Sequence, residues 1–170
     1  MGEEEKSSKK RKKQNVEEET EGGKSVKKRK SSISGTKSYE ERLKNVSIIS
    51  KPMASRKLTK KAYKLVKKAS SSKCVRRGVK EVVKSLRKGE KGFCILAGDI
   101  SPIDVISHIP IYCEEQDVPY VYVPSKQDLG GAALTKRPTS VVLIKEKKGF
   151  SSQELLDEIV EEAKSLAVKY

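Results

Sequence analysis

Three short apolar runs, separated by segments with helical periodicity, constrain the fold of this chain more than any other feature. They lie at residues 92–98, 118–123 and 140–145. Each run has the length of a strand, and residues 92–98 contain no charged position, as expected for a strand that is covered on both faces. Helices that alternate with such strands predict a three-layer α/β/α sandwich with a small mixed sheet. A weaker fourth strand is expected near residues 46–49.

Apolar side chains recur every three or four positions in three further segments, which predicts amphipathic helices. The first stripe consists of Leu58, Ala62, Leu65, Val66 and Ala69. The second consists of Val75, Val79, Val82, Val83 and Leu86. The last consists of Leu155, Leu156, Ile159, Val160, Ala163, Leu166 and Ala167. The second helix is expected to run from about residue 75 to 88 and to stop at Gly89, since glycine is the usual residue just past a helix end.

Hydroxyl side chains mark where the other helices begin. Ser101 and Pro102 predict an N-cap and a first-turn proline for a helix that residues 108–110 interrupt before it continues to Glu115. Residues 125–128 resemble a capping box with Asp in place of Glu and predict a short helix. Residues 151–154 are expected to cap the final helix.

The positive charge is concentrated in one part of the chain. The formal net charge is +15, and residues 51–91 hold sixteen Lys or Arg but only two acids, Glu81 and Glu90. We expect this region to supply a basic face, centred on the outer side of the second helix, for a polyanion such as nucleic acid or an anionic membrane surface. The outer side of the second helix carries Arg76, Lys80, Lys84, Arg87 and Lys88.

No stretch approaches the roughly 18 apolar residues of a membrane span, so we predict a soluble intracellular protein.

The first 38 residues are nearly all Lys, Arg, Glu, Ser and Gly. Such a segment cannot bury enough apolar surface to offset its ordering entropy, so we predict a disordered charged tail at 1–38 and a folded domain at 39–170. Its basic runs at residues 9–13 and 27–30 are typical of nuclear-localisation or nonspecific nucleic-acid patches. A purely solubilising tail is the alternative.

Side chains that could perform catalysis are few and have structural explanations. His108 lies among apolar residues, and a pair with Cys113 is the only nucleophile and base arrangement in reach. Asp99 and Asp104 are candidate paired carboxylates, but Asp104 is better explained by the dipole of its helix. The three cysteines lack metal-ligand or redox spacing and are expected to be small buried groups. We therefore predict no metal, no cofactor and no enzymatic activity, with an RNA-modifying enzyme as the alternative.

Four strings, in order, carry a family resemblance. They are RGVKEVVK at 77–84, AGDISP at 97–102, VPSKQDLG at 123–130 and KRPTSV at 136–141. The first resembles the RNA-binding signature of the archaeal–eukaryotic kink-turn protein family, which includes ribosomal, spliceosomal and guide-RNA particle proteins. The resemblance covers roughly residues 50–167. Taken together, the strings look most like those of the family members in H/ACA guide ribonucleoproteins.

The resemblance implies an α/β/α sandwich that binds RNA at the N-terminal end of the helix at 75–88 and on two neighbouring loops. Gly78 would let the RNA backbone approach closely, Glu81 would accept hydrogen bonds from a guanine edge, and Lys84 would contact RNA beside it. The alternative for Glu81 is an ordinary helical pair with Arg77 and Lys84. The full set of RNA-binding positions that we expect is Arg77, Gly78, Lys80, Glu81, Lys84, Lys88, Ser101, Val105, Lys126, Thr135, Lys136 and Arg137.

Lys80 departs from the family pattern, because selective members usually carry Asn immediately before the Glu. Asn both donates and accepts at a base edge, whereas Lys only donates and acts mainly as a point charge. Residues 134–136 also differ from the loop of selective members. We therefore expect binding to structured RNA with weak kink-turn selectivity, and placement by protein partners.

The resemblance also implies a biological setting. It predicts a non-catalytic subunit of an H/ACA particle in the nucleus and nucleolus, which supports guide-directed pseudouridylation and processing of ribosomal RNA. The expected partners are the H/ACA guide RNA, the pseudouridine synthase subunit and small accessory proteins; outside the particle we expect a monomer with no membrane association. A kink-turn binder of a ribosomal or spliceosomal particle is the alternative within the family.

Overall fold

The computed structural model describes residues 38–146 and 152–166, which are built around a four-stranded mixed sheet. The strands are β1 (Val75–Arg77), β2 (Gly92–Ala97), β3 (Tyr120–Val123) and β4 (Val141–Lys145), in the order β1-β4-β2-β3. β2 and β3 are parallel, and β4 is antiparallel to both β1 and β2. Every residue of β2 is buried, so the prediction of a strand covered on both faces is confirmed.

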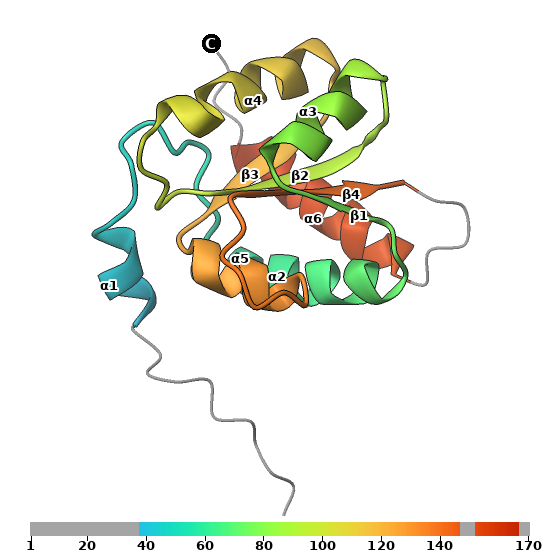
Figure 1. Ribbon diagram of the computed structural model, residues 1–170. Helices are drawn as coiled ribbons and strands as arrows, with labels where there is room; N and C mark the ends of the chain where they lie inside the picture. Colours follow the sequence, from blue (N-terminus) through green and yellow to red (C-terminus); the bar gives the residue numbers. More distant parts are fainter. Residues whose placement is uncertain (1–37, 147–151, 167–170) are drawn as a thin grey trace, which may run out of the picture. The chain divides into compact units, whose positions relative to one another are not determined.

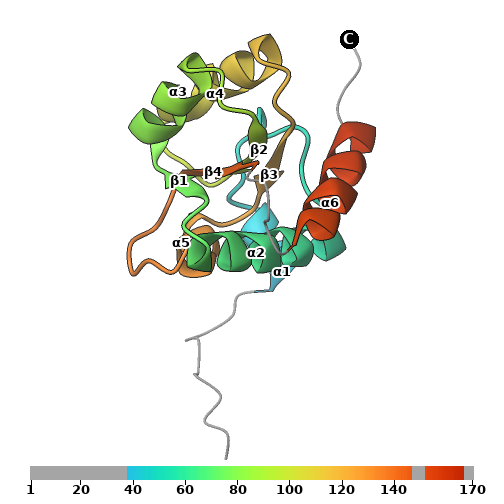
Figure 2. The same ribbon diagram turned by 90° about the vertical axis from the view of Figure 1, so that its right-hand side faces the viewer.

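Helices cover both faces of this sheet, which confirms the three-layer α/β/α prediction (Figures 1 and 2). α3 (Val79–Arg87) and α4 (Asp104–Glu115) pack together on one face. α2 (Arg56–Ser71), α5 (Lys126–Ala132) and α6 (Gln153–Leu166) lie on the other, where α2 contacts both neighbours. A short α1 (Tyr39–Leu43) precedes them, and its Arg42 forms an ion pair with Asp128 of α5.

The predicted stripe of α2 is confirmed. Leu58, Ala62, Leu65, Val66 and Ala69 are all buried in the main core cluster. Ser55 begins the helix, since its side chain accepts a hydrogen bond from the Leu58 N–H.

The prediction of one helix over residues 75–88 is wrong at its start. Residues 75–77 form β1, in which Val75 lies opposite Ile144 of β4, and the helix begins only at Val79. Gly78 separates the two elements with φ 89°, a conformation that no α-helix continues through. Pairing with a distant strand therefore overrides the helical spacing of Val75. The fourth strand is thus β1, and the strand expected near residues 46–49 is absent, because those residues lie in a loop.

Two details of α4 also differ from the prediction. Neither Ser101 nor Pro102 caps it, because the helix begins at Asp104 and makes no side-chain cap hydrogen bond. The expected interruption at residues 108–110 is absent, and Pro110 lies inside a continuous helix. Ile106, Ile109 and Cys113 are fully buried, and this packing offsets the backbone hydrogen bond that a proline removes.

The caps of the last two helices differ in outcome. The predicted cap of α5 is confirmed, since the Ser125 side chain accepts from the Asp128 N–H. The Ser152 hydroxyl makes no hydrogen bond, so the predicted side-chain cap of α6 is wrong at this residue. Leu166 is 42% exposed and lies outside the buried stripe of α6. The tail predicted at 1–38, Ser151 and Ala167 lie outside the described residues, except for Ser38, which precedes α1.

Candidate nucleic-acid interface

The sheet topology brings four chain segments to one edge. β1, β2 and β3 end where the antiparallel β4 begins. Gly78 follows β1, Ser101 lies in the loop after β2, Lys126 opens α5 after β3, and residues 135–137 precede β4. Most of the predicted RNA-binding residues therefore lie at this edge, which we call the sheet-end surface.

Gly78 marks the point where α3 begins. Its N–H donates a 3.0 Å hydrogen bond to the Val141 carbonyl, which anchors the start of α3 to the start of β4. A Cβ atom at this position would meet nothing within 4 Å, so the surface is open there. The need for glycine comes from the positive φ, a reason that the sequence alone did not reveal.

The first turn of α3 carries opposite charges on exposed side chains. Lys80 and Glu81 both lie in it, and Lys84 follows one turn later. Glu81 is near the positive end of the helix dipole, where a carboxylate is stabilised. The helical pair with Arg77 that we considered for Glu81 is wrong, because Arg77 is in β1. No ion pair of Glu81 is present within the described residues.

Arg77 is committed to an internal contact. Its Nη1 donates a 2.8 Å hydrogen bond to the Ala133 carbonyl, which also accepts from the Ser70 hydroxyl at 3.0 Å. Arg77 therefore joins β1 to the loop after α5 and holds this loop in place.

Asp99 joins two loops of the sheet-end surface. Its Oδ1 accepts a 2.8 Å hydrogen bond from the Lys126 N–H, and the Lys126 ammonium lies 3.3 Å from the Asp99 carbonyl oxygen. Lys126 is thereby oriented through both its backbone and its side chain. In the sequence Asp99 is a candidate only for a catalytic carboxylate, and the one signal for this structural role is an Asp directly after a buried strand.

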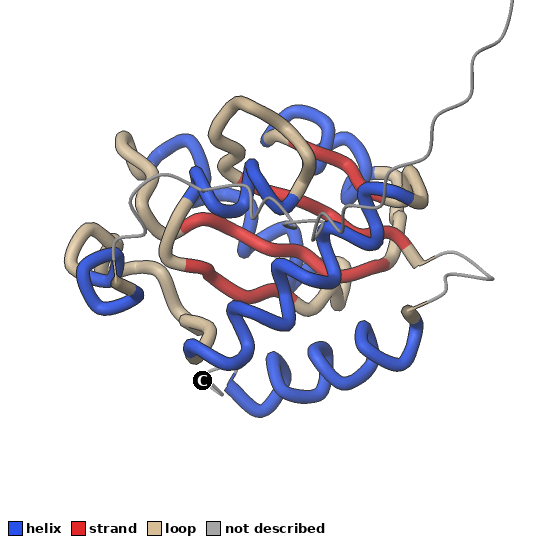
Figure 3. Tube along the Cα trace, turned by 90° about the horizontal axis from the view of Figure 1, so that it is seen from below, coloured by secondary structure: helices blue, strands red, loops and turns tan. Residues whose placement is uncertain are grey.

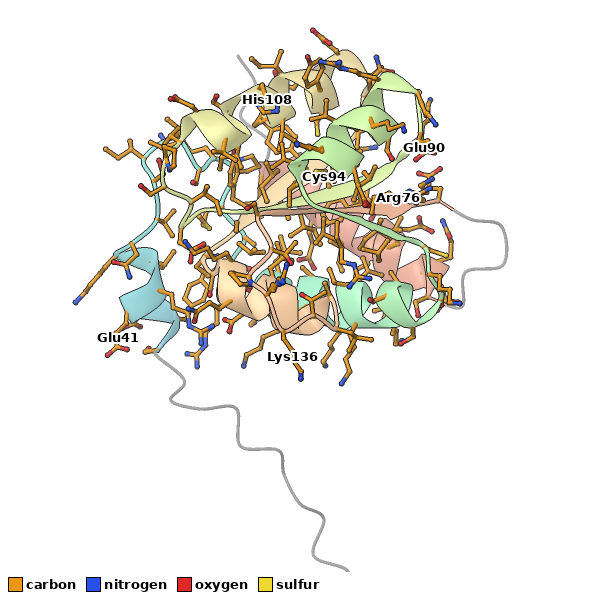
Figure 4. All side chains as sticks on the ribbon, in the orientation of Figure 1. Glu41, Arg76, Glu90, Cys94, His108 and Lys136 are labelled. Atoms are coloured by element: carbon orange, nitrogen blue, oxygen red, sulfur yellow. The ribbon has the colours of Figure 1, made fainter. Side chains whose placement is uncertain are left out.

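The loop of residues 133–138 is held by a threonine and a glycine. The Thr135 hydroxyl lies 3.0 Å from the Gly130 carbonyl oxygen and 2.9 Å from that of Arg137. A Cβ atom on Gly130 would lie 2.4 Å from the Arg137 carbonyl oxygen, so only glycine permits this close packing. The side chains of Lys136 and Arg137 are left exposed, and Figure 4 shows Lys136 at the outer side of the loop.

Not every predicted residue joins this surface. Lys88 is the C-cap of α3, at the opposite end of the helix from Gly78 and close to the start of β2. Ser101 and Val105 are exposed beside the loop after β2, and Val105 is 41% exposed. Ile103 lies between them and is exposed to the same extent.

A groove of about 440 Å³ between α3 and α4 extends from the first turn of α3. Arg87 is not free there, because its guanidinium lies 5.3 Å from the Tyr112 ring centroid and its Nη2 donates to the Tyr112 hydroxyl. The ring of His108 packs edge-on against the Tyr112 ring, so His108 has a structural contact in the protein. The lining residues are Val79, Lys80, Val83, Lys84, Arg87, Lys88 and His108.

The residues considered for catalysis have structural contacts or are buried. Cys74, Cys94 and Cys113 are free and buried, which confirms the expectation for them. A hydrogen bond with Cys113, together with burial, raises the pKa of Cys94 well above its ordinary value. Within residues 38–146 and 152–166, no group of three or more His, Cys, Asp or Glu side chains is placed to hold a metal ion. In the same part of the chain, no helix is both long enough and apolar enough to cross a membrane.

An α/β/α sandwich that gathers basic loops and a helix N-terminus at one sheet edge has the character of an RNA-binding module. Residues 60–154 match the sequence model of the ribosomal protein L7Ae/L30e/S12e/Gadd45 family, and the chain belongs to this family.

Curated relatives cover most of the chain. It is 53% identical over 135 residues to the H/ACA ribonucleoprotein complex subunit 2-like protein of Xenopus laevis, covering 79% of this chain and 89% of that protein. It is 54% identical over 125 residues to the protein of the same description in Arabidopsis thaliana, with 74% of each covered. Among solved structures, the Giardia lamblia 15.5kD RNA binding protein matches with a TM-score of 0.68 and 31% identity, covering 72% of this chain and all of that chain.

Proposed function

We propose that this chain is the non-catalytic RNA-binding core subunit of an H/ACA ribonucleoprotein and supports guide-directed pseudouridylation and processing of ribosomal RNA. The observation that carries the proposal is identity above 50%, over most of both chains, to proteins described as H/ACA ribonucleoprotein subunits. The chemistry belongs to a partner synthase.

RNA binds at the sheet-end surface. Basic side chains on three segments of the chain attract the RNA phosphates: Lys84, Lys126, and Lys136 with Arg137. Glu81 accepts hydrogen bonds from a guanine edge. Gly78 keeps the backbone of α3 accessible at its open face. Ser101, Val105 and Thr135 lie in the loops that border the RNA, while Lys80 and Lys88 add charge along α3. Arg77 holds the loop after α5 in position.

The partners follow from membership of the particle. They are the H/ACA guide RNA, a pseudouridine synthase subunit and small accessory proteins, and the site of action is the nucleus, with concentration in the nucleolus. Outside the particle the chain is a monomer. The charged segment before Ser38 supports nuclear import through its two basic runs.

Purification of the tagged full chain from cells, followed by sequencing of the bound RNA, tests the assignment. Strong enrichment of H/ACA guide RNAs is expected, together with co-purification of a pseudouridine synthase. Recovery of ribosomal-subunit or spliceosomal RNA in place of H/ACA guides would overturn it and favour a kink-turn binder of another particle.

The enzyme alternative has a separate test. The purified chain alone is incubated with a guide RNA and its substrate, and pseudouridine is quantified. No product is expected, and neither Cys113→Ala nor His108→Ala changes this result. Modification by the lone protein, lost in either variant, would refute a purely structural role.

A further inference from the structure

The solvent side of α2 carries a row of basic side chains, which we call the cation stripe. With 3.6 residues per turn, all but Lys61 fall on the exposed side of the helix, and Lys61 lies at the flank that contacts α6. The segment Arg56–Ser71 contains no acidic residue. The stripe consists of Arg56, Lys57, Lys60, Lys61, Lys64, Lys67 and Lys68.

The cation stripe is separate from the basic residues of α3, because α2 and α3 cover opposite faces of the sheet (Figures 1 and 2). Seen from below, α2 lies across the near face of the strands (Figure 3). The expectation that residues 51–91 supply one basic face is therefore wrong. The charge excess of this region is divided between two faces, and the predicted RNA-binding positions include none of the residues of α2.

Most of the stripe has no anionic partner in the protein. Within the described residues, only Lys61 is ion-paired, with Glu158 at 2.7 Å and with Glu162, both on α6. These hydrogen bonds raise the pKa of Lys61. The acidic residues of α6 thus border the stripe on one side and neutralise only one of its cations.

The other side of the stripe adjoins the sheet-end surface. Ser70, near the end of α2, donates to the Ala133 carbonyl at the start of the loop that carries Lys136 and Arg137. Figure 4 shows Lys136 on the same side of the sheet as α2. The C-terminal end of the stripe is therefore next to the loop that carries Lys136.

Helix stability does not explain this composition. Arg56 and Lys60, Lys60 and Lys64, and Lys64 and Lys68 are each four residues apart, a spacing at which like charges destabilise a helix. The first turn has no acidic residue, so its cations lie unfavourably at the positive end of the helix dipole. A polyanion along the stripe relieves both repulsions.

We propose that the cation stripe is a second phosphate-binding surface, which takes the backbone of an RNA duplex that extends beyond the sheet-end surface. The stripe spans roughly 18 Å along the helix axis, at about 1.5 Å per residue. Lysine ammonium groups bind phosphate as point charges, so the contact is independent of base sequence. A membrane is a poor occupant, because the apolar side of α2 is buried against the core and unavailable for insertion. The proposal rests on RNA binding by this chain and adds a surface on the face of the sheet opposite α3.

The test compares two full-length variants with equal loss of charge. K60Q/K64Q/K67Q removes cations from the stripe, and K51Q/K91Q/K164Q removes exposed lysines that lie outside both surfaces. The probe is a stem-loop RNA with an extended duplex, and binding is measured across a series of salt concentrations. The stripe variant is expected to bind about tenfold or more weakly at low salt and to lower the slope of log affinity against log salt by about two to three. The control is expected to retain the wild-type slope to within about one half.

Lysine labelling of the unmodified protein gives an independent readout. RNA is expected to protect Lys60, Lys64 and Lys67 from acetylation and to leave Lys51 and Lys164 reactive. Unchanged salt slope in the stripe variant, or equal reactivity with and without RNA, overturns the proposal. If the stripe variant keeps the wild-type salt slope but the tagged chain still recovers H/ACA guide RNAs, the stripe proposal is wrong and the proposed function stands. If the stripe variant lowers the slope but no H/ACA guide RNAs are recovered, only the assignment to the H/ACA particle is refuted.

Discussion

The backbone N–H of Lys126 donates a 2.8 Å hydrogen bond to Oδ1 of Asp99 and thereby joins the start of α5 to the loop after β2. The two residues lie far apart along the chain, at the ends of neighbouring parallel strands. One carboxylate thus sets the position of a basic side chain at the sheet-end surface.

Asp99→Ala is expected to lower the free energy of unfolding by about 2 kcal/mol, because a hydrogen bond to a charged acceptor is lost and the Lys126 N–H is left without a partner. Asp99→Asn keeps an oxygen acceptor and is expected to lose about half as much. Urea unfolding measures both. Equal stability of the wild type and the alanine variant contradicts the anchoring role.

Gly78→Ala is expected to destabilise the fold by about 1–2 kcal/mol, because φ 89° is unfavourable for any residue with a Cβ, although the space around that atom is open. Gly131→Ala is the matched control. Its added Cβ also meets nothing within 4 Å, but Gly131 lies in α5 without a positive φ, so a gain of up to about 1 kcal/mol is expected. Thermal unfolding of the two variants decides; a neutral Gly78→Ala refutes the conformational argument.

Lys80→Asn is expected to raise the affinity ratio between a kink-turn and a plain hairpin of equal length about tenfold, since one polar contact to a base edge discriminates by about 1–3 kcal/mol. The wild-type ratio is expected to stay below about one hundred, because Lys80 attracts phosphate without reading a base. Lys91→Asn, with the same charge loss at the far edge of the sheet, controls for electrostatics. A wild-type ratio above this value, or an equal rise in both variants, would falsify the account of weak selectivity.

Stability is expected to fall with rising pH above about 9. Burial raises the pKa of Tyr122 from 10.0 to about 12, and contact with Cys113 raises that of Cys94. The unfolded chain therefore loses these protons at a lower pH than the folded protein, so it binds fewer protons and becomes favoured as the pH rises. Urea midpoints between about pH 8 and 11 measure the effect. Tyr122→Phe should flatten the upper part of this dependence; an unchanged profile argues against the assignment to Tyr122.

The hydrophobic pattern correctly predicted the helices and strands whose structure depends on neighbouring residues alone. The buried run at residues 92–98 and the stripe of α2 both behave as their patterns require. Val75 does not, because its spacing fits the helix of Val79 and Val82, while its actual partner, Ile144, is far along the chain. The strand at residues 75–77 is distinguished from the helix that begins at Val79 only by this long-range pairing and by the positive φ of Gly78.

The candidate site divides in the same way. The family resemblance located Glu81, Lys126 and Lys136 on segments that the sheet brings together. The hydrogen bonds of Arg77 with Ala133 and of Lys126 with Asp99 depend on how loops meet in space, so no spacing reveals them. The division of the basic charge between α2 and α3 was hidden for the same reason, because charge counts do not tell which face of a sheet a helix covers.

β4 lies between β1 and β2, and within the sheet β1 has no other partner. During synthesis, β1 and the Gly78 turn leave the ribosome long before Val141–Lys145 does. β2 and β3 contact each other directly, so their pairing does not need β4. The sheet-end surface is therefore completed only after β4 has been synthesised, and a nascent chain that stalls before residue 141 carries its basic segments without the strand that aligns them.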